Sequence, residues 1–193
     1  NINVDVVTNA LAHSDKRIMG PQYMKAGMGD GGGCHPRDNI ALRYMAQELG
    51  LGYDMFDAIM NAREIQAHNL AARLVDVANE KNLPVYIHGK AYKPGVDYLD
   101  GSYSLLVGYY CEKFGVAPIY IDPLTKDNLQ TNEPGVFMLA HSSSTTYRYT
   151  LNDRDDYLYC EIPSGSIVVD PWRTFKTQRS DIEVIHYGNT RLG

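Results

Sequence analysis

Apolar residues in the first 81 positions recur at the three- and four-residue spacing of amphipathic helices. One group runs from Val4 to Leu11, and a second runs from Ile40 to Leu49, where Gly50 ends it. A longer third helix is predicted from Asp54 to Lys81. Its length indicates a spine between two domains or a dimer interface, although a helix that only covers its own core fits the periodicity equally well.

After Pro84 the pattern changes to short apolar runs. The order is a buried strand over Val85–Ile87, a helix over Ser102–Phe114 with Gly115 just past its end, and a strand over Pro118–Ile121. This βαβ unit predicts a parallel sheet. Further strands are expected at Val136–Ala140, Ser166–Val169 and Glu183–Ile185, and the polar stretch Ser142–Asp156 is expected to be a surface excursion.

These elements predict an α/β protein with two domains. Residues 1–81 form an N-terminal all-helical region, and its long helix joins a Rossmann-like parallel α/β domain over residues 82–193. A chain of 193 residues can bury one good core or two small ones.

Charge and composition exclude several classes of function. The net charge is −5 and no Lys/Arg cluster with interleaved aromatics occurs, so we expect no nucleic-acid partner. No apolar run reaches the length of a membrane span, and Asn1–Asp5 lacks the start of a signal peptide. The cysteines Cys34, Cys111 and Cys160 are odd in number and far apart, which favours a reducing compartment, and we expect a cytoplasmic protein. The chain does not start with Met, and we interpret it as a fragment.

The run from Ala26 to Asp38 carries the main candidate chemistry, because it places Cys34 between a glycine-rich loop and a predicted helix. Five glycines let the backbone approach a ligand without a Cβ obstacle. The unpaired amides and the dipole of a helix start favour an anion, and they lower the pKa of a thiol. We therefore expect a reactive cysteine, with a structural cysteine as the alternative. Asp38 lies one helical turn later and can reach the same site, or it is a plain carboxylate of the first turns.

Two other interpretations of this run are set aside. Gly27-x-Gly29-x-x-Gly32 matches the dinucleotide fingerprint, but no convincing strand precedes it, so the match is accidental. Cys34-His35 has no second pair at ligand spacing, and we expect no metal.

Lysines follow the first predicted strand, in the stretch from Gly89 to Gly95. Ligands of open α/β sheets bind at this edge. Two lysines and the helix start at Ser102 predict an anion site for a phosphorylated ligand, with a solvated loop as the alternative. The histidines at or near strand ends, namely His88, His141 and His186, are expected to be packing or surface residues.

These pieces, in this order, resemble the UDP-glucose/GDP-mannose dehydrogenase family. The strongest likeness is Gly27-Met28-Gly29-Asp30-Gly31-Gly32-Gly33-Cys34-His35-Pro36-Arg37-Asp38, which is similar to the family's Gly-x-Gly-x-Gly-Gly-x-Cys-x-Pro-Lys-Asp signature. Asp15-Lys16-Arg17-Ile18, Asn61, Lys90-Ala91-Tyr92-Lys93-Pro94, Asp122-Pro123 and Val168–Arg173 extend it. The Lys of the signature is Arg37 here, and Val96, Tyr98 and Asp100 replace the Thr, Asp and Arg that the family has before Ser102.

The resemblance implies an NAD-dependent enzyme that oxidises the C6 alcohol of a nucleotide sugar to a carboxylate in two hydride transfers. Cys34 would be the nucleophile that forms a thiohemiacetal and then a thioester, and Asp38 would assist proton transfer or orient water. The remaining implied contacts are to substrate: Tyr23, Lys25, Gly27 and Gly31 in the loop that holds the sugar nucleotide, Tyr92, Lys93 and Arg173 at the nucleotide and its phosphates, and Arg17 reaching a neighbouring subunit's site.

The resemblance further implies a homodimer through the helix near Asp54–Lys81 and a UDP-sugar-binding domain over residues 82–193. The family's N-terminal NAD-binding domain is not in this sequence, so we expect the chain to be inactive alone. UDP-glucose is the first choice of substrate, with GDP-mannose or a UDP-N-acetyl sugar as alternatives. A non-catalytic sugar-nucleotide-binding or assembly module is a different class of function, and so is a helical protein with an unrelated α/β domain.

Overall fold

The computed structural model describes residues 2–13, 24, 26–29, 32–127, 131–142 and 161–189. Its elements are α1 (Val4–Ala12), α2 (Cys34–Glu48), α3 (Met55–Lys81), β1 (Val85–His88), α4 (Tyr103–Lys113), β2 (Ile119–Ile121), the short 3-10 helix η2 (Pro123–Thr125), β3 (Val136–Leu139), β4 (Ile167–Asp170) and β5 (Glu183–His186). Most of the predicted polar stretch from Ser142 to Asp156 lies outside the described residues.

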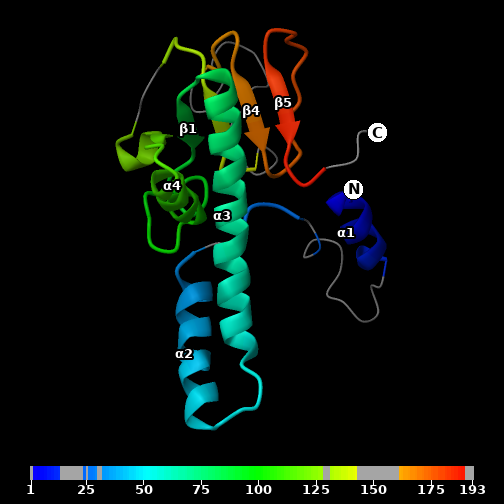
Figure 1. The fold of residues 1–193 in the computed structure, drawn as a ribbon, viewed down its shortest axis with the longest axis vertical. Helices are drawn as coiled ribbons and strands as arrows, with labels where there is room; N and C mark the ends of the chain where they lie inside the picture. Colours follow the sequence, from blue (N-terminus) through cyan, green and yellow to red (C-terminus); the bar gives the residue numbers. More distant parts are fainter. Residues whose placement is uncertain are drawn as a thin grey trace.

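The long helix α3 has a defined start and a defined end. The Asp54 carboxylate accepts hydrogen bonds from the backbone amides of Phe56 and Asp57, which caps the first turn. Asn82 follows the last turn in the left-handed region, with φ +54°, and this conformation ends the helix. In Figure 1 α3 runs through the molecule, with α2 beside its first half and the sheet and α4 beside its second half.

The strands of the described residues form one five-stranded sheet in the order β2-β1-β3-β4-β5, and each neighbouring pair is parallel. The predicted parallel α/β fold is confirmed. Ile87 on the inner strand β1 pairs with Tyr120 on β2 and with Met138 on β3. The residues of β1, β3 and β4 are all buried, as expected for parallel strands covered on both faces.

Alternate residues of the strands supply two separate cores. Val85, Ile87, Val136 and Met138 pack with Leu74 and the rest of the buried half of α3 and with α4. Tyr86, Phe137, Leu139 and Val168 point to the opposite face, where Ile162, Phe175 and Ile182 contact them. The sheet therefore has a helical layer on one face and, in the described part of the chain, loop residues on the other.

Ser102 occupies the N-cap position of α4, but its hydroxyl does not cap the helix. The Ser102 hydroxyl instead donates to the carbonyl oxygen of Lys90, at 2.7 Å, and Ser104 donates to the same oxygen at 3.0 Å. The predicted helix start at Ser102 is confirmed. Its role is to bind the backbone of the loop after β1 to the start of α4.

Apolar side chains along α2 and the first half of α3 remain exposed. They include Ile40, Leu42, Met45, Leu49, Met55, Ile59 and Ile65. Within the described residues only Ala46 of α2 is buried, so the apolar stripe predicted for this helix does not belong to the core of the single chain. Exposed apolar surface of this extent is typical of an interaction site.

His88, at the end of β1, is fully buried, and this burial lowers its pKa from 6.5 to about 3. The unfolded chain therefore binds a proton more readily than the folded chain between pH 6.5 and pH 3, and stability falls as the pH drops through this range. We expect His88 to lower the free energy of unfolding by about 2 kcal/mol between pH 7.5 and pH 5. Urea denaturation at both pH values measures this difference.

A His88→Asn variant, which has no imidazole to protonate, should lose less stability than the wild-type chain over the same pH interval. The exposed His13 gives the matched control His13→Asn, which should keep the wild-type difference. Equal pH dependence in the wild-type chain and His88→Asn would contradict the prediction.

Candidate functional site

Cys34 is the first residue of α2 and its side chain is exposed. The N-cap residue Gly33 has no side chain that could bind the amides of the first turn. Free amides and the helix dipole make this end of α2 favourable for a negative charge. The structure thus places the thiol at the junction of loop and helix where the sequence predicts it.

Gly27 and Gly29 lie against aromatic rings of the protein itself. A Cβ atom on Gly27 would be 2.2 Å from a ring carbon of Trp172, and one on Gly29 would be 2.2 Å from a ring carbon of Tyr103. Gly29 also has φ +49°, which other residues rarely adopt. At these two positions the space that a side chain would occupy is filled by the rings, so the absence of a Cβ serves packing within the protein.

The loop after β1 lies against the end of the glycine-rich loop. A Cβ on Gly101 would be 2.4 Å from the carbonyl carbon of Gly32 and the amide nitrogen of Gly33, and one on Gly32 would be 3.1 Å from the Tyr92 ring. The ammonium group of Lys93 lies 5.2 Å from the centroid of the same ring. Tyr92 and Lys93 are therefore brought to the helix start that carries the thiol.

Asp122, which is 1% exposed, holds the first residues of this loop. One oxygen of its carboxylate accepts hydrogen bonds from the backbone amides of Lys90, at 2.9 Å, and Ala91, at 3.0 Å. The ammonium group of Lys90 pairs with Asp127 at 2.9 Å. Of the two lysines predicted to bind an anion, Lys90 is thus used within the protein, and the exposed Lys93 is the one available to a ligand.

Asp38 lies one turn after Cys34 and is exposed. The Arg37 guanidinium donates a hydrogen bond to its carboxylate at 2.8 Å, and this bond lowers the pKa of Asp38 below its usual value. The carboxylate is therefore ionised near neutral pH. Arg37 therefore competes with any other hydrogen-bond donor at the start of α2 for the Asp38 carboxylate.

A cavity of about 560 Å³ lies beside the first residues of the glycine-rich loop, Ala26–Gly29. The loop backbone, the middle of α3 and the segments after β4 and β5 surround it, and its lining includes Gly27, Arg63, Asn69, Tyr103 and Arg173. Cys34 does not line this cavity. The cavity thus borders the first residues of the loop, whereas the thiol follows its last residue.

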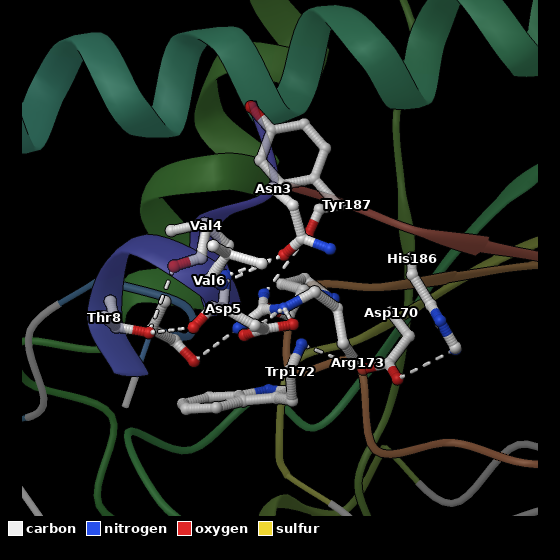
Figure 2. Close-up of polar contacts among 12 residues, drawn as sticks. Asn3, Val4, Asp5, Val6, Thr8, Asp170, Trp172, Arg173, His186 and Tyr187 are labelled. Carbon is white, nitrogen blue, oxygen red and sulfur yellow. Dashed lines mark hydrogen bonds and ion pairs between the residues drawn. The ribbon is translucent and has the colours of Figure 1, made fainter. Parts of the chain in front are cut away.

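Arg173 follows β4, and its side chain is only 6% exposed. Figure 2 shows its guanidinium between Asp5 of α1, the Trp172 indole and the Tyr187 backbone. Nε donates to both carboxylate oxygens of Asp5, at 2.9 and 2.8 Å, and one Nη donates to the carbonyl oxygen of Ala26, at 2.8 Å. The predicted phosphate ligand is therefore largely engaged by groups of the protein.

Several predicted site residues, Arg17, Tyr23, Lys25 and Gly31, lie outside the described residues, as does Cys160. In the described part of the chain no group of three or more His, Cys, Asp or Glu side chains could hold a metal ion. A search of the described residues for a helix long and apolar enough to cross a membrane found none.

Sequence reasoning missed Trp172, Tyr103 and Asp5 as parts of this site. Trp172 is the only tryptophan of the chain and precedes Arg173, which is a signal that could have found it. Tyr103 stands among many tyrosines, and Asp5 looks like an ordinary acidic residue of a first helical turn. Nothing in the sequence connects Asp5 with Arg173, 168 positions later.

Comparison with known proteins gives sequence relatives. Residues 1–65 match the sequence model of the UDP-glucose/GDP-mannose dehydrogenase family, central domain. UDP-glucose 6-dehydrogenase from Pseudomonas aeruginosa is 28% identical over 84% of this chain and 34% of its own length. UDP-glucose 6-dehydrogenase from Rattus norvegicus is 25% identical over 95% of this chain and 37% of its own length. The chain thus spans about a third of the length of these curated relatives.

A solved UDP-glucose dehydrogenase from the archaeon Pyrobaculum islandicum has a similar fold, with a TM-score of 0.66 and 21% identity. The likeness covers 94% of this chain and 42% of that one. The family match lies on the helices and the cysteine loop, while the relatives and the solved structure extend the similarity through the sheet. Sequence and fold agree: the chain is similar to members of the UDP-glucose/GDP-mannose dehydrogenase family, in sequence most clearly over residues 1–65 and in fold over the described α/β sheet.

Proposed function

We propose that this chain is the thiol-bearing and nucleotide-sugar-binding part of an NAD-dependent dehydrogenase of the UDP-glucose 6-dehydrogenase type. The single observation that carries the proposal is the exposed Cys34 at the first residue of α2, directly after a loop that packs against the parallel α/β sheet domain. Residues 1–81 would be the central helical domain, and residues 82–193 the domain that binds the UDP-sugar.

The substrate-binding role is assigned to residues from both domains. Lys93 is exposed beside the Tyr92 ring and is a suitable partner for a diphosphate. Gly27 and Arg173 line the cavity beside the loop, which has the volume of a small-molecule site. Arg17, Tyr23, Lys25 and Gly31 complete the proposed set by the resemblance to the family.

The chemistry assigned to Cys34 is addition to an aldehyde. The thiolate sulfur forms a bond to the C6 carbon, the carbonyl electron pair moves to oxygen, and that oxygen takes a proton. Asp38 is ionised one turn away and is placed to exchange a proton or orient water. This addition needs no oxidant, because it changes only which atoms are bonded to the carbon.

NAD would supply the hydride acceptor for the oxidations, but the residues described here do not fit it. Gly27, Gly29 and Gly32 match the letters of a dinucleotide loop, yet the described residues before them form no strand. Each of the three faces a ring of the protein. We therefore assign none of the described residues to the cofactor.

The proposed dimer is supported by the exposed apolar side chains on α2 and the first half of α3. These side chains belong to the apolar stripes that predicted the helices, and no layer of the described residues covers them. A second copy that covers them would remove this surface from water.

Binding and alkylation experiments on the purified chain test the proposal. UDP-glucose is expected to bind in a calorimetric titration, while ADP-glucose, which carries the wrong base, serves as the matched control and should bind more weakly. Iodoacetamide at pH 7 should label Cys34 at least about tenfold faster than Cys111, because Cys111 is buried and burial raises its pKa to about 12. Peptide mapping separates the two cysteines, and bound UDP-glucose should slow the labelling of Cys34.

Two outcomes would count against the proposal. Labelling of Cys34 no faster than that of Cys111 would remove the nucleophile, and failure of every UDP- and GDP-sugar to bind would remove the nucleotide-sugar site. Tighter binding of GDP-mannose than of UDP-glucose would keep the family chemistry and change the substrate.

A further inference from the structure

The guanidinium of Arg173 joins three segments that are far apart in the sequence. It pairs with Asp5 on α1, donates to the Ala26 carbonyl in the glycine-rich loop, and donates to the Tyr187 carbonyl just after β5 at 3.2 Å. Arg173 also has φ +56°, an uncommon backbone conformation for a residue other than glycine. The turn after β4 is thus shaped to aim this side chain at the loop.

Asp5 is the carboxylate that fixes the orientation of the guanidinium in the described part of the chain. Nε contacts both of its oxygens, and the side chain of Arg173 is too buried for water to replace this partner fully. A buried guanidinium that loses its counter-charge is strongly unfavourable. Removing the charge of Asp5 therefore releases Arg173 from its position.

Two neighbouring residues of the turn after β4 contact the glycine-rich loop. Arg173 holds the Ala26 carbonyl, while Trp172 lies against Gly27. Asp170 fixes the turn in its place, because its buried carboxylate accepts a hydrogen bond from the backbone amide of Trp172 at 2.9 Å. A shift of Arg173 reaches the loop without any contact between Asp5 and the loop itself.

We propose that Asp5 is a positioning residue, which acts through Arg173 to fix the start of the glycine-rich loop and thereby the geometry between the cavity and Cys34. This inference rests on the proposed function, because it gives the loop its task of presenting the thiol to a nucleotide sugar. Asp5 holds the loop from outside and does not touch the substrate.

The test is hydrogen–deuterium exchange of the loop amides in three variants of the whole chain. Asp5→Asn removes the charge and keeps the size, and it should raise exchange over residues 26–33 about tenfold. Asp5→Glu keeps the charge and should restore most of the protection. Asp181→Asn is the matched control, since Asp181 also pairs with an arginine and its side chain has the same 41% exposure as that of Asp5. It should leave the loop unchanged.

Hydrogen–deuterium exchange in the core strand β3 distinguishes a local effect on the loop from a loss of overall stability. Unchanged loop exchange in Asp5→Asn would overturn the inference, and so would an equal rise in the loop and in Val136–Leu139, which would show only a loss of overall stability. A failure of Asp5→Glu to restore protection would also count against it. Binding of UDP-glucose to the wild-type chain is scored separately, so loss of the proposed function leaves the exchange result intact.

Discussion

Replacing Gly101 with alanine is expected to lower the free energy of unfolding by about 3 kcal/mol or more. Gly101 has φ +73°, and a Cβ there would lie 2.4 Å from backbone atoms of Gly32 and Gly33. Backbone atoms cannot rotate away as a side chain can, so the loop after β1 and the glycine-rich loop must separate. Denaturant unfolding of the purified variant measures the loss, and the fluorescence of Trp172, the only tryptophan, reports on the loop that packs against it.

Two glycines of this chain provide matched controls. Gly115 has φ +86° but no atom within 4 Å of an added Cβ, so Gly115→Ala should show only the backbone strain, about 1 kcal/mol. Gly52 has no such φ and also faces open space, so its alanine variant should stay within about 0.5 kcal/mol of wild type. A Gly101→Ala variant no less stable than Gly115→Ala would show that the two loops can move apart freely.

Asp122→Ala is expected to destabilise the chain by about 3 kcal/mol. The buried carboxylate accepts hydrogen bonds from the backbone amides of Lys90 and Ala91 through one oxygen and from that of Leu124, at 3.1 Å, through the other. Alanine leaves these donors without an acceptor, and unsatisfied buried donors are unfavourable. Urea denaturation gives the size of the loss, and the affinity for UDP-glucose should fall with it, because this loop carries Tyr92 and Lys93.

A second substitution at Asp122 separates the effect of the residue's size from the effect of its charge. Asp122→Asn keeps an oxygen that can accept a hydrogen bond and should destabilise the chain less than alanine. The exposed Asp97 lies in the same loop, and Asp97→Ala should change stability by less than about 0.5 kcal/mol. If Asp122→Ala unfolded at the same urea concentration as Asp97→Ala, the three hydrogen bonds would not hold the loop.

The glycine spacing shows why a short motif can match for the wrong reason. Gly27, Gly29 and Gly32 have the letters of a dinucleotide loop, but no strand is predicted before them, so the match is accidental. The structure gives the positions a different purpose. Each glycine packs against an aromatic ring from a later part of the chain. The spacing of the glycines does not indicate which ring this is.

Local pattern by itself determined the secondary structure and the place of the thiol. Four-residue apolar runs such as Val136–Leu139 became buried parallel strands, because a sheet covered on both faces needs apolar residues at every position. Helical periodicity placed the helices, and the glycines before Cys34 placed it at the start of α2. These features depend on neighbours within a few positions, which a sequence displays directly.

Only the tertiary structure decided what the side chains of the site touch. The contacts of Arg173 with Asp5 and of Gly27 with Trp172 bring together residues that are more than 140 positions apart. Lys90 was predicted to bind an anion, but its charge pairs with Asp127, 37 positions later. The physical reason is that the residue type determines which groups a charge or a ring can bind, while the folded chain determines which of these groups lies within reach.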